Sequence, residues 1–248
     1  ALVINDMLVV DTTNSGNAPA GAAITFGSTV NSQANESNTI VLTAGSGNIT
    51  LSGAVGQSVN GGVGAITVHS AGTLHVNAEV ARAQSLNVAS ATSIAGNIST
   101  TGTQTYSGAV TLSGGSRTLT TSNGNVTFSS TVNSEANQNR ALTLALGTGQ
   151  ATFGGVVGGT RALGAVGITG TLDLNANVAG AASLSVSGAA DLGANVSTTG
   201  NWADVGHYTQ IVWRNTTQVG CGLASGGGND TLVCRYSPPG NFTGQAPF

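Results

Sequence analysis

Short runs in which apolar and polar residues alternate recur along most of the chain. Clear examples are Ile49-Thr50-Leu51, Ile66-Thr67-Val68, Leu74-His75-Val76, Leu86-Asn87-Val88 and Val126-Thr127-Phe128. Clusters of small residues with Gly or Asn separate these runs, as at residues 45–48 and 122–125. No stretch shows the longer apolar spacing of an amphipathic helix. The pattern predicts an all-β protein of many short, half-buried strands joined by tight turns.

The chain also contains an internal duplication. Residues 24–56 match residues 126–158 without a gap at 16 of 33 positions, and residues 73–102 match residues 171–200 at 16 of 30. Both blocks keep the order of their strand-like runs, and the phrase Thr-Val-Asn-Ser occurs at 29–32 and again at 131–134. We therefore predict two copies of one structural unit, at 24–102 and 126–200.

Equivalent strand ends within the first copy recur at a loosely kept interval of about 20 residues. Examples are Val30, Val55, Val80 and Ile98. Such an interval, without helical segments, predicts a solenoid in which the inward Val, Ile, Leu and Ala side chains of one coil stack on those of the next. Strands of successive coils then pair about 4.8 Å apart along the axis.

Composition excludes several other classes of protein. The 248 residues include 38 Gly, no Lys, and only 6% charged side chains, with a net charge of −3. This small imbalance gives no reason to expect a nucleic-acid partner or binding to an anionic membrane. The absence of Lys excludes a phosphate loop with its lysine and a Schiff-base lysine. Low charge with 40% hydrophobic residues argues against ordinary disorder.

Both the repeat and the composition change at about residue 201. After Gly102 the first copy continues with Thr-Gln-Thr-Tyr, whereas Gly200 is followed by Asn-Trp-Ala-Asp. Both Trp, both Cys and three of the four Pro lie in the last 48 residues. We predict two domains, a β-solenoid at 1–200 and a separate segment at 201–248.

The repeat region resembles a known group of proteins. The Thr-Val-Asn-Ser phrase and residues 106–112 (Tyr-Ser-Gly-Ala-Val-Thr-Leu) are similar to repeats of large bacterial surface exoproteins of the filamentous haemagglutinin type. The resemblance implies a right-handed parallel β-helix, secretion, and an adhesive role at the cell surface. Because the secretion domain of such exoproteins is not present, it also implies an interior section of a longer rod, in contact with further solenoid coils of a parent chain.

The last 48 residues contain the most specific motifs. Residues 206–213 (Gly-His-Tyr-Thr-Gln-Ile-Val-Trp) and 234–242 (Cys-Arg-Tyr-Ser-Pro-Pro-Gly-Asn-Phe) resemble the two C-terminal signatures of the CAP superfamily, which includes cysteine-rich secretory proteins, antigen 5 and plant pathogenesis-related proteins. The matched positions are Gly206, His207, Tyr208, Thr209, Gln210, Trp213, Tyr236, Pro238, Pro239, Gly240 and Asn241. The resemblance implies the last β-strands of a CAP α-β-α sandwich, at 207–213 and 231–236, without the elements that normally precede them.

The two cysteines, Cys221 and Cys234, both lie in this segment. On neighbouring antiparallel strands they can form a disulfide if their Cα atoms lie within about 7 Å. By the chain-entropy model such a bond would contribute about 3 kcal/mol, and it suits an oxidising, extracellular compartment. The alternative is a pair of reduced, buried thiols.

The CAP resemblance also implies a candidate metal ligand. In that family two His and two Glu side chains can hold a divalent cation, and only His207 matches one of these positions. One imidazole does not make a zinc site, which needs three or four ligands. We therefore expect no cofactor and no working metal cavity of the family type. His69 and His75 lack ligand spacing to any third residue and are expected at the surface or in turns.

No pair of carboxylates suited to acid–base chemistry is evident within residues 1–200. The leading hypothesis is a secreted, non-catalytic bacterial adhesin or stalk segment at the cell surface. Its partner would be an unidentified ligand on a host or neighbouring cell, with no nucleic acid and no membrane span. The alternative is a CAP-type extracellular domain that binds a divalent cation or a lipid, with the repeat as its stalk.

Overall fold

The computed structural model describes residues 1–58, 61–198, 217–226 and 229–239, which contain β-strands and no helix. The prediction of an all-β chain with stacked parallel strands is confirmed for these residues. The chain divides into two compact units, Ala1–Thr198 and Thr199–Phe248. Within the described part of the chain, no helix is long and apolar enough to cross a membrane.

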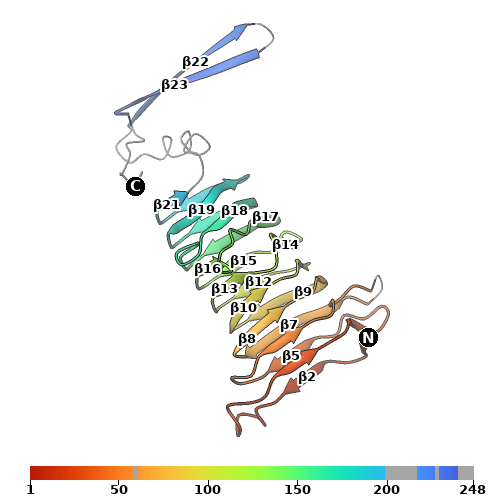
Figure 1. The fold of residues 1–248 in the computed structure, drawn as a ribbon. Coiled ribbons are helices and arrows are strands. Elements are labelled where there is room, and N and C mark those ends of the chain that lie inside the picture. Colours follow the sequence, from red (N-terminus) through yellow and green to blue (C-terminus); the bar gives the residue numbers. More distant parts are fainter. Residues whose placement is uncertain (59–60, 199–216, 227–228, 240–248) are drawn as a thin grey trace. The chain divides into compact units, whose positions relative to one another are not determined.

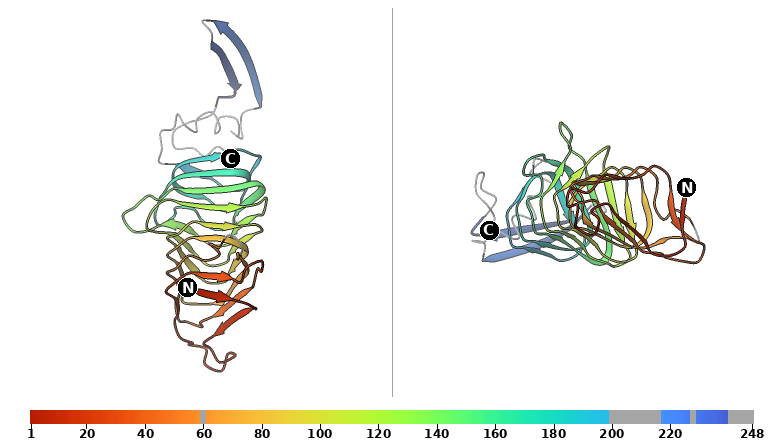
Figure 2. Two further views of the ribbon diagram at one scale, coloured as in Figure 1. Left: turned by 90° about the vertical axis from the view of Figure 1, so that its right-hand side faces the viewer. Right: turned by 90° about the horizontal axis from the view of Figure 1, so that it is seen from below.

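The first unit is a stack of coils whose named strands all pair in parallel with those of neighbouring coils (Figures 1 and 2). Each coil passes over three faces, which we call A, B and C. Face A includes β3 (Ile24–Phe26), β6 (Ile49–Leu51), β8 (Thr73–Val76), β10 (Ala91–Ile94), β13 (Val110–Leu112) and β16 (Val132–Ser134), in that order. Face B includes β1 (Leu2–Ile4), β4 (Val30–Ser32), β11 (Ile98–Thr100) and β14 (Arg117–Thr121).

Face C includes β2 (Leu8–Asp11), β5 (Ile40–Thr43), β12 (Gln104–Tyr106), β15 (Val126–Phe128) and β20 (Ala190–Leu192). Four longer strands turn the corner from face B to face C: β7 (Val63–Ser70), β9 (Val80–Val88), β17 (Leu142–Phe153) and β18 (Leu163–Leu174). Strand β19 (Val178–Val186) turns from face A to face B, and β21 (Val196–Thr198) pairs with its start. The long strands therefore join the faces into one continuous stack.

Backbone register confirms the stacking of the strand ends. Val30, Val55 and Val80 follow one another down face B through parallel bridges, and Val80 pairs with Ile98. Each of these side chains is no more than 1% exposed. The interval in the sequence is therefore the length of one coil, and the recurring apolar residue is the one that points into the core.

Aromatic side chains form a ladder in the core below face C. The rings of Tyr106 and Phe128 stack with centroids 5.2 Å apart, and Phe128 stacks on Phe153 at 5.1 Å. All three residues are in register across β12, β15 and β17. Because each ring covers the next, three of the largest side chains in this unit are almost fully removed from water.

Asparagine side chains connect one coil to the next. The Oδ1 atoms of Asn31 and Asn133 accept hydrogen bonds from the backbone N–H groups of Ser58 and Thr160, each at 3.0 Å. Equivalent bonds run from Thr73 to Asn48, Thr118 to Asn97, Thr148 to Asn123 and Asn195 to Asn177. In the repeated Thr-Val-Asn-Ser phrase, the Val is thus buried while the Asn binds the next coil.

The two copies of the duplication lie on different faces. Val30 is on face B, but its counterpart Val132 pairs with Val110 on face A. Leu86 is on face C, whereas its counterpart Leu184 lies on face B. The second copy is therefore turned by one face about the solenoid axis, because the offset between copies is not a whole number of coils.

The second unit contains two described strands, β22 (Gln218–Gly226) and β23 (Asn229–Ser237), which form an antiparallel pair. Gly226 pairs with Asn229 at the end of the ladder, and Cys221 is directly opposite Cys234. The strand expected at 207–213 lies outside the described residues, and the one expected at 231–236 falls within β23.

Candidate functional site

Few of the CAP motif residues fall in the described part of the chain. Tyr236 is half-buried near the end of β23, opposite Val219, and is followed by exposed Pro238 and Pro239. Outside the described residues lie Gly206, His207, Tyr208, Thr209, Gln210, Trp213, Gly240 and Asn241. The candidate metal ligand His207 is among them, so its role stays a prediction.

The backbone brings Cys221 and Cys234 to directly opposing positions of the β22–β23 ladder. Opposed residues in an antiparallel pair have Cα atoms about 4.5–5.5 Å apart. Disulfides span Cα separations of about 4.4–6.8 Å. The register is thus compatible with the predicted bond, which stays a prediction.

The histidines of the solenoid are not brought together with other ligand types. His69 is exposed on β7, and half-buried His75 on β8 lies between Thr50 and Ser93 of the neighbouring coils. Within the described ranges, no three His, Cys, Asp or Glu side chains gather as a metal site would require.

One small group of charges lies near the start of the second copy. The guanidinium of Arg140 contacts the carboxylate of Glu135 at 2.6 Å, and Glu135 also accepts the backbone N–H of Gly114 at 3.1 Å. Burial and the charge of Arg140 lower the pKa of nearby Arg117, while Glu135 opposes that shift. Because these charges bind one another and the local backbone, they hold the loop after β16 in place.

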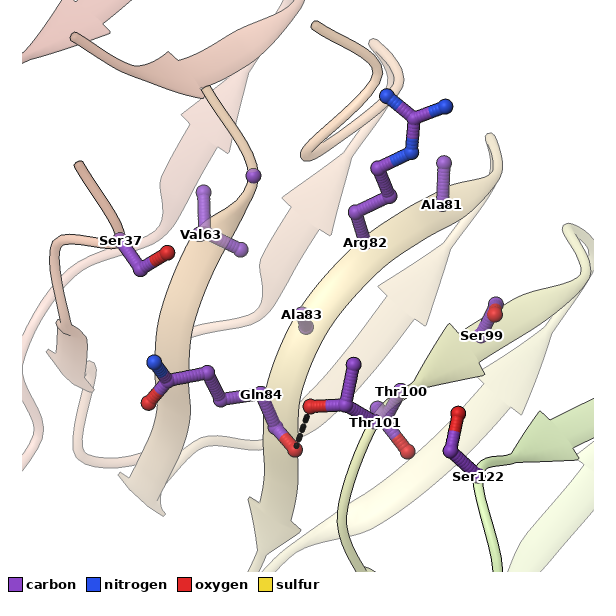
Figure 3. A pocket seen from close by; sticks show the side chains of 11 residues that line it. Ser37, Val63, Ala81, Arg82, Ala83, Gln84, Ser99, Thr100, Thr101 and Ser122 are labelled. Atoms are coloured by element: carbon purple, nitrogen blue, oxygen red, sulfur yellow. Dashed lines mark hydrogen bonds between the residues drawn. The ribbon is translucent and has the colours of Figure 1, made fainter. Parts of the chain in front are cut away.

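A groove runs across several coils at the corner between faces B and C. Its volume is about 440 Å³. It is lined by Ser37, Gly62, Val63, Ala81, Arg82, Ala83, Gln84, Ser99, Thr100, Thr101 and Ser122 (Figure 3). Successive coils contribute to it at β7, β9, β11 and the turn after β14. The side chains of Ser37, Arg82, Gln84, Thr101 and Ser122 are all exposed to solvent.

A β-bulge positions the arginine of this groove. Val80 pairs with Ile98 and Ala83 pairs with Thr100, so Ala81 and Arg82 together oppose one residue of β11. A bulge of this kind bends the strand and changes the direction of a side chain. In Figure 3 the Arg82 side chain extends outward from β9, and its Nη1 donates to the carbonyl of Ser58 at 3.1 Å.

Gly62 lies close to Arg82 and has no side chain that would crowd it. A Cβ atom at Gly62 would lie 2.9 Å from the carbonyl oxygen of Arg82 and 3.2 Å from its Cβ. On the other side, the Thr101 hydroxyl donates to the carbonyl of Gln84 at 3.4 Å, which ties adjacent coils together across the groove (Figure 3). The sequence alone did not indicate this groove, because its residues are 85 positions apart at the extremes and look like ordinary turn residues.

Comparison with known proteins identifies one family. The model of the cysteine-rich secretory protein (CAP) family matches residues 78–236. That range begins well before the junction predicted at residue 201 and includes solenoid strands from β9 onward as well as β22 and most of β23. The described residues within it contain no helix, so they do not show the α-layers of the sandwich that the family resemblance implies.

Similar individual proteins come from plants and wasps. The chain is 54% identical over 44 residues to the basic form of pathogenesis-related protein 1 of Nicotiana tabacum, covering 17% of this chain and 25% of that protein. It is 51% identical over 49 residues to venom allergen 5 of Polybia scutellaris rioplatensis, covering 18% and 24%. The chain thus spans about a quarter of the length of these relatives. No solved structure matches. The resemblance of residues 1–200 to exoprotein repeats stays a prediction.

Proposed function

The chain belongs to the cysteine-rich secretory protein (CAP) family, and we propose that it is a secreted, non-catalytic protein whose β-solenoid acts as an adhesive segment or stalk at a bacterial cell surface. The family's description as secretory supports an extracellular location. We also propose that this solenoid is a right-handed β-helix of the filamentous haemagglutinin type.

The observation that carries this proposal is the continuous parallel stack from β1 to β21. Its apolar side chains point into one core, so the outward side chains of each coil form rows along three faces. A stack of this kind supplies an extended surface on a rigid backbone, which is how solenoid proteins bind partners. It also serves as a spacer, because every added coil lengthens it by about 4.8 Å.

Adhesion is tested by attachment of the purified full-length chain, coupled to fluorescent beads, to panels of bacterial and animal cells. We expect saturable attachment that excess unlabelled chain competes away. Beads coated with a helical protein of similar charge serve as the control. Attachment no greater than that control on every surface would refute the adhesive role and leave the spacer role alone.

A second candidate function rests on the family match itself. In this alternative the C-terminal segment is a CAP-type domain that binds a divalent cation or a lipid, and the solenoid is its stalk. The antiparallel pairing of β22 with β23, which opposes Cys221 to Cys234, supports an ordered, disulfide-linked hairpin in that segment.

This alternative makes a distinct prediction for zinc. Isothermal titration of the oxidised chain would show stoichiometric zinc uptake that His207→Ala abolishes and that His69→Ala leaves unchanged. Uptake without dependence on His207 would contradict a family-type cation site. The same pair of variants separates the C-terminal segment from the solenoid, since His69 lies on β7.

A further inference from the structure

We infer that the groove at the corner of faces B and C binds an acidic glycan, through a sugar carboxylate held by Arg82 and sugar hydroxyls held by Gln84, Thr101 and Ser122. The inference rests on the adhesive role proposed above and names the class of ligand. No motif in the sequence assigns a role to these residues.

The internal duplication shows that the backbone does not need these side chains. The second copy has the same bulge: Val178 pairs with Val196 and Ala181 with Thr198, so Ala179 and Gly180 together oppose one residue. Gly180 occupies the place of Arg82, and Ala182 that of Gln84. Because the bulge also forms with Gly180 and Ala182 at these positions, the fold does not require Arg82 and Gln84.

Arg82 has the donors that a carboxylate needs. The guanidinium carries five N–H donors in a planar fork, and in the described part of the chain it makes one hydrogen bond, to the Ser58 carbonyl. No ion pair to Arg82 occurs among the described residues, and the nearest acid in sequence, Glu79, accepts from Gln57 at 3.2 Å. An exposed guanidinium with remaining donors binds a carboxylate in a bidentate manner.

Polar side chains continue the groove along the solenoid axis. Gln84, Thr101 and Ser122 come from three consecutive coils at the same corner, and each is exposed. The Gln84 side chain extends toward the strand that contains Val63 (Figure 3). Hydroxyl and amide groups both donate and accept hydrogen bonds. Coils about 4.8 Å apart therefore present such groups at short, regular steps, which suits a chain of sugars with hydroxyls on every ring.

Other extended ligands fit this groove less well. The lining contains no aromatic ring on which a neutral sugar or a nucleobase would stack. A nucleic acid would also meet a chain with net charge −3 and a single arginine in the groove, whereas phosphate backbones require several cations. The volume of about 440 Å³ lies in the usual range for small-ligand sites.

The test is biolayer interferometry of the full-length, oxidised chain against three immobilised glycans: oligogalacturonate for carboxylates, heparin for sulfates, and dextran as the neutral chain. We expect oligogalacturonate to bind most tightly. Arg82→Ala combined with Gln84→Ala gives the groove residues close to those of the second copy, and binding should weaken about tenfold or more. Arg82→Lys keeps the positive charge but lacks the planar guanidinium, and its affinity for oligogalacturonate should be intermediate.

Arg161→Ala is the matched control, because it removes an equal charge from an exposed arginine outside the groove. It should bind oligogalacturonate as the wild type does, and all variants should unfold at the same temperature. Equal losses in the Arg161 and Arg82 variants would overturn the inference, as would tighter binding of heparin or dextran. If the double variant still attaches to cells as the wild type does, the groove inference fails while adhesion stands. If the wild-type chain binds neither glycan nor cell, both fail.

Discussion

Gln104 is a buried polar residue in a column of aliphatic ones. It pairs with Leu86 in one neighbouring coil and Val126 in the other, and it is 0% exposed. Its Oε1 accepts the Tyr106 hydroxyl at 2.9 Å, and its Nε2 donates to the Thr120 carbonyl at 3.0 Å. The network satisfies each of these groups, so the cost of burying them is offset. The sequence did not identify Gln104 as an inward residue, because a polar side chain gives no sign in the sequence of the buried partners that satisfy it.

Replacing Tyr106 by Phe tests this network. The ring and its stack on Phe128 remain, while the Gln104 oxygen loses the phenolic donor inside the core. We expect the free energy of unfolding to fall by about 1–3 kcal/mol, measured by urea denaturation at neutral pH. The double change Gln104→Leu with Tyr106→Phe restores an apolar column and should recover most of the loss. A single variant as stable as the wild type would contradict the network.

We also expect the buried hydroxyl of Tyr106 to lower the stability of the protein at high pH. Burial raises the pKa of its hydroxyl above the ordinary value, so the folded state favours the neutral form. The free energy of unfolding is therefore unaffected below the unfolded-state pKa of about 10. It falls as the pH rises further, because the hydroxyl loses its proton more readily in the unfolded state. Urea denaturation above about pH 10 should show a decline that Tyr106→Phe lessens. An equal decline in the wild type and in Tyr106→Phe would mean that other titrating groups cause the loss of stability.

Asp11 acts at the opposite end of the pH range. Hydrogen bonds from the hydroxyl and the backbone N–H of Thr13 lower the pKa of its carboxylate. Burial opposes this shift, and the backbone N–H of Ser15 adds to it. The stabilisation is present above the ordinary value of 3.8 and is lost as the pH falls through the folded-state pKa. Asp11→Asn should therefore flatten the acid end of a plot of melting temperature against pH. An unchanged acid limb would show that this turn does not contribute.

At the scale of the element, the recurring Asn residues link the coils. In Asn133→Ala the backbone N–H groups of Thr160 and Arg161 lose their acceptor, at 3.0 and 3.2 Å. We expect a loss of about 0.5–1.5 kcal/mol in the free energy of unfolding. Asn87→Ala is the control, since this exposed side chain on β9 makes no hydrogen bond within the described residues. Equal losses in the two variants would mean that the bond between coils contributes nothing.

The pattern of the sequence predicted most of these strands but not their faces. Alternating runs such as residues 49–51 and 126–128 coincide with β6 and β15, because burial of one side of a strand leaves a period of two in the sequence. The duplication gave no sign that Val132 would lie on a different face from Val30. That rotation depends on the summed lengths of the turns. The site was predicted less well. The groove around Arg82 depends on a bulge in β9, and the position of a bulge follows from the pairing of β9 with β11, which the sequence alone does not show.

In the molecule as a whole, the family match and the described solenoid overlap over residues 78–198. The match to the CAP family runs from residue 78 to residue 236, yet the described residues up to Thr198 are solenoid strands in parallel register. In this chain, the described residues within the matched range up to Thr198 form strands and no helix. Residues 78–198 are therefore described as coils of a β-solenoid.

Far-ultraviolet circular dichroism of the purified full-length chain distinguishes solenoid coils from α-layers in these residues. The described residues contain 23 strands and no helix, so we expect a β-type spectrum without the double minimum of α-helix, and a single loss of that signal on heating. A spectrum dominated by helix would rule out the solenoid, because it would place the family's α-layers where the coils are described.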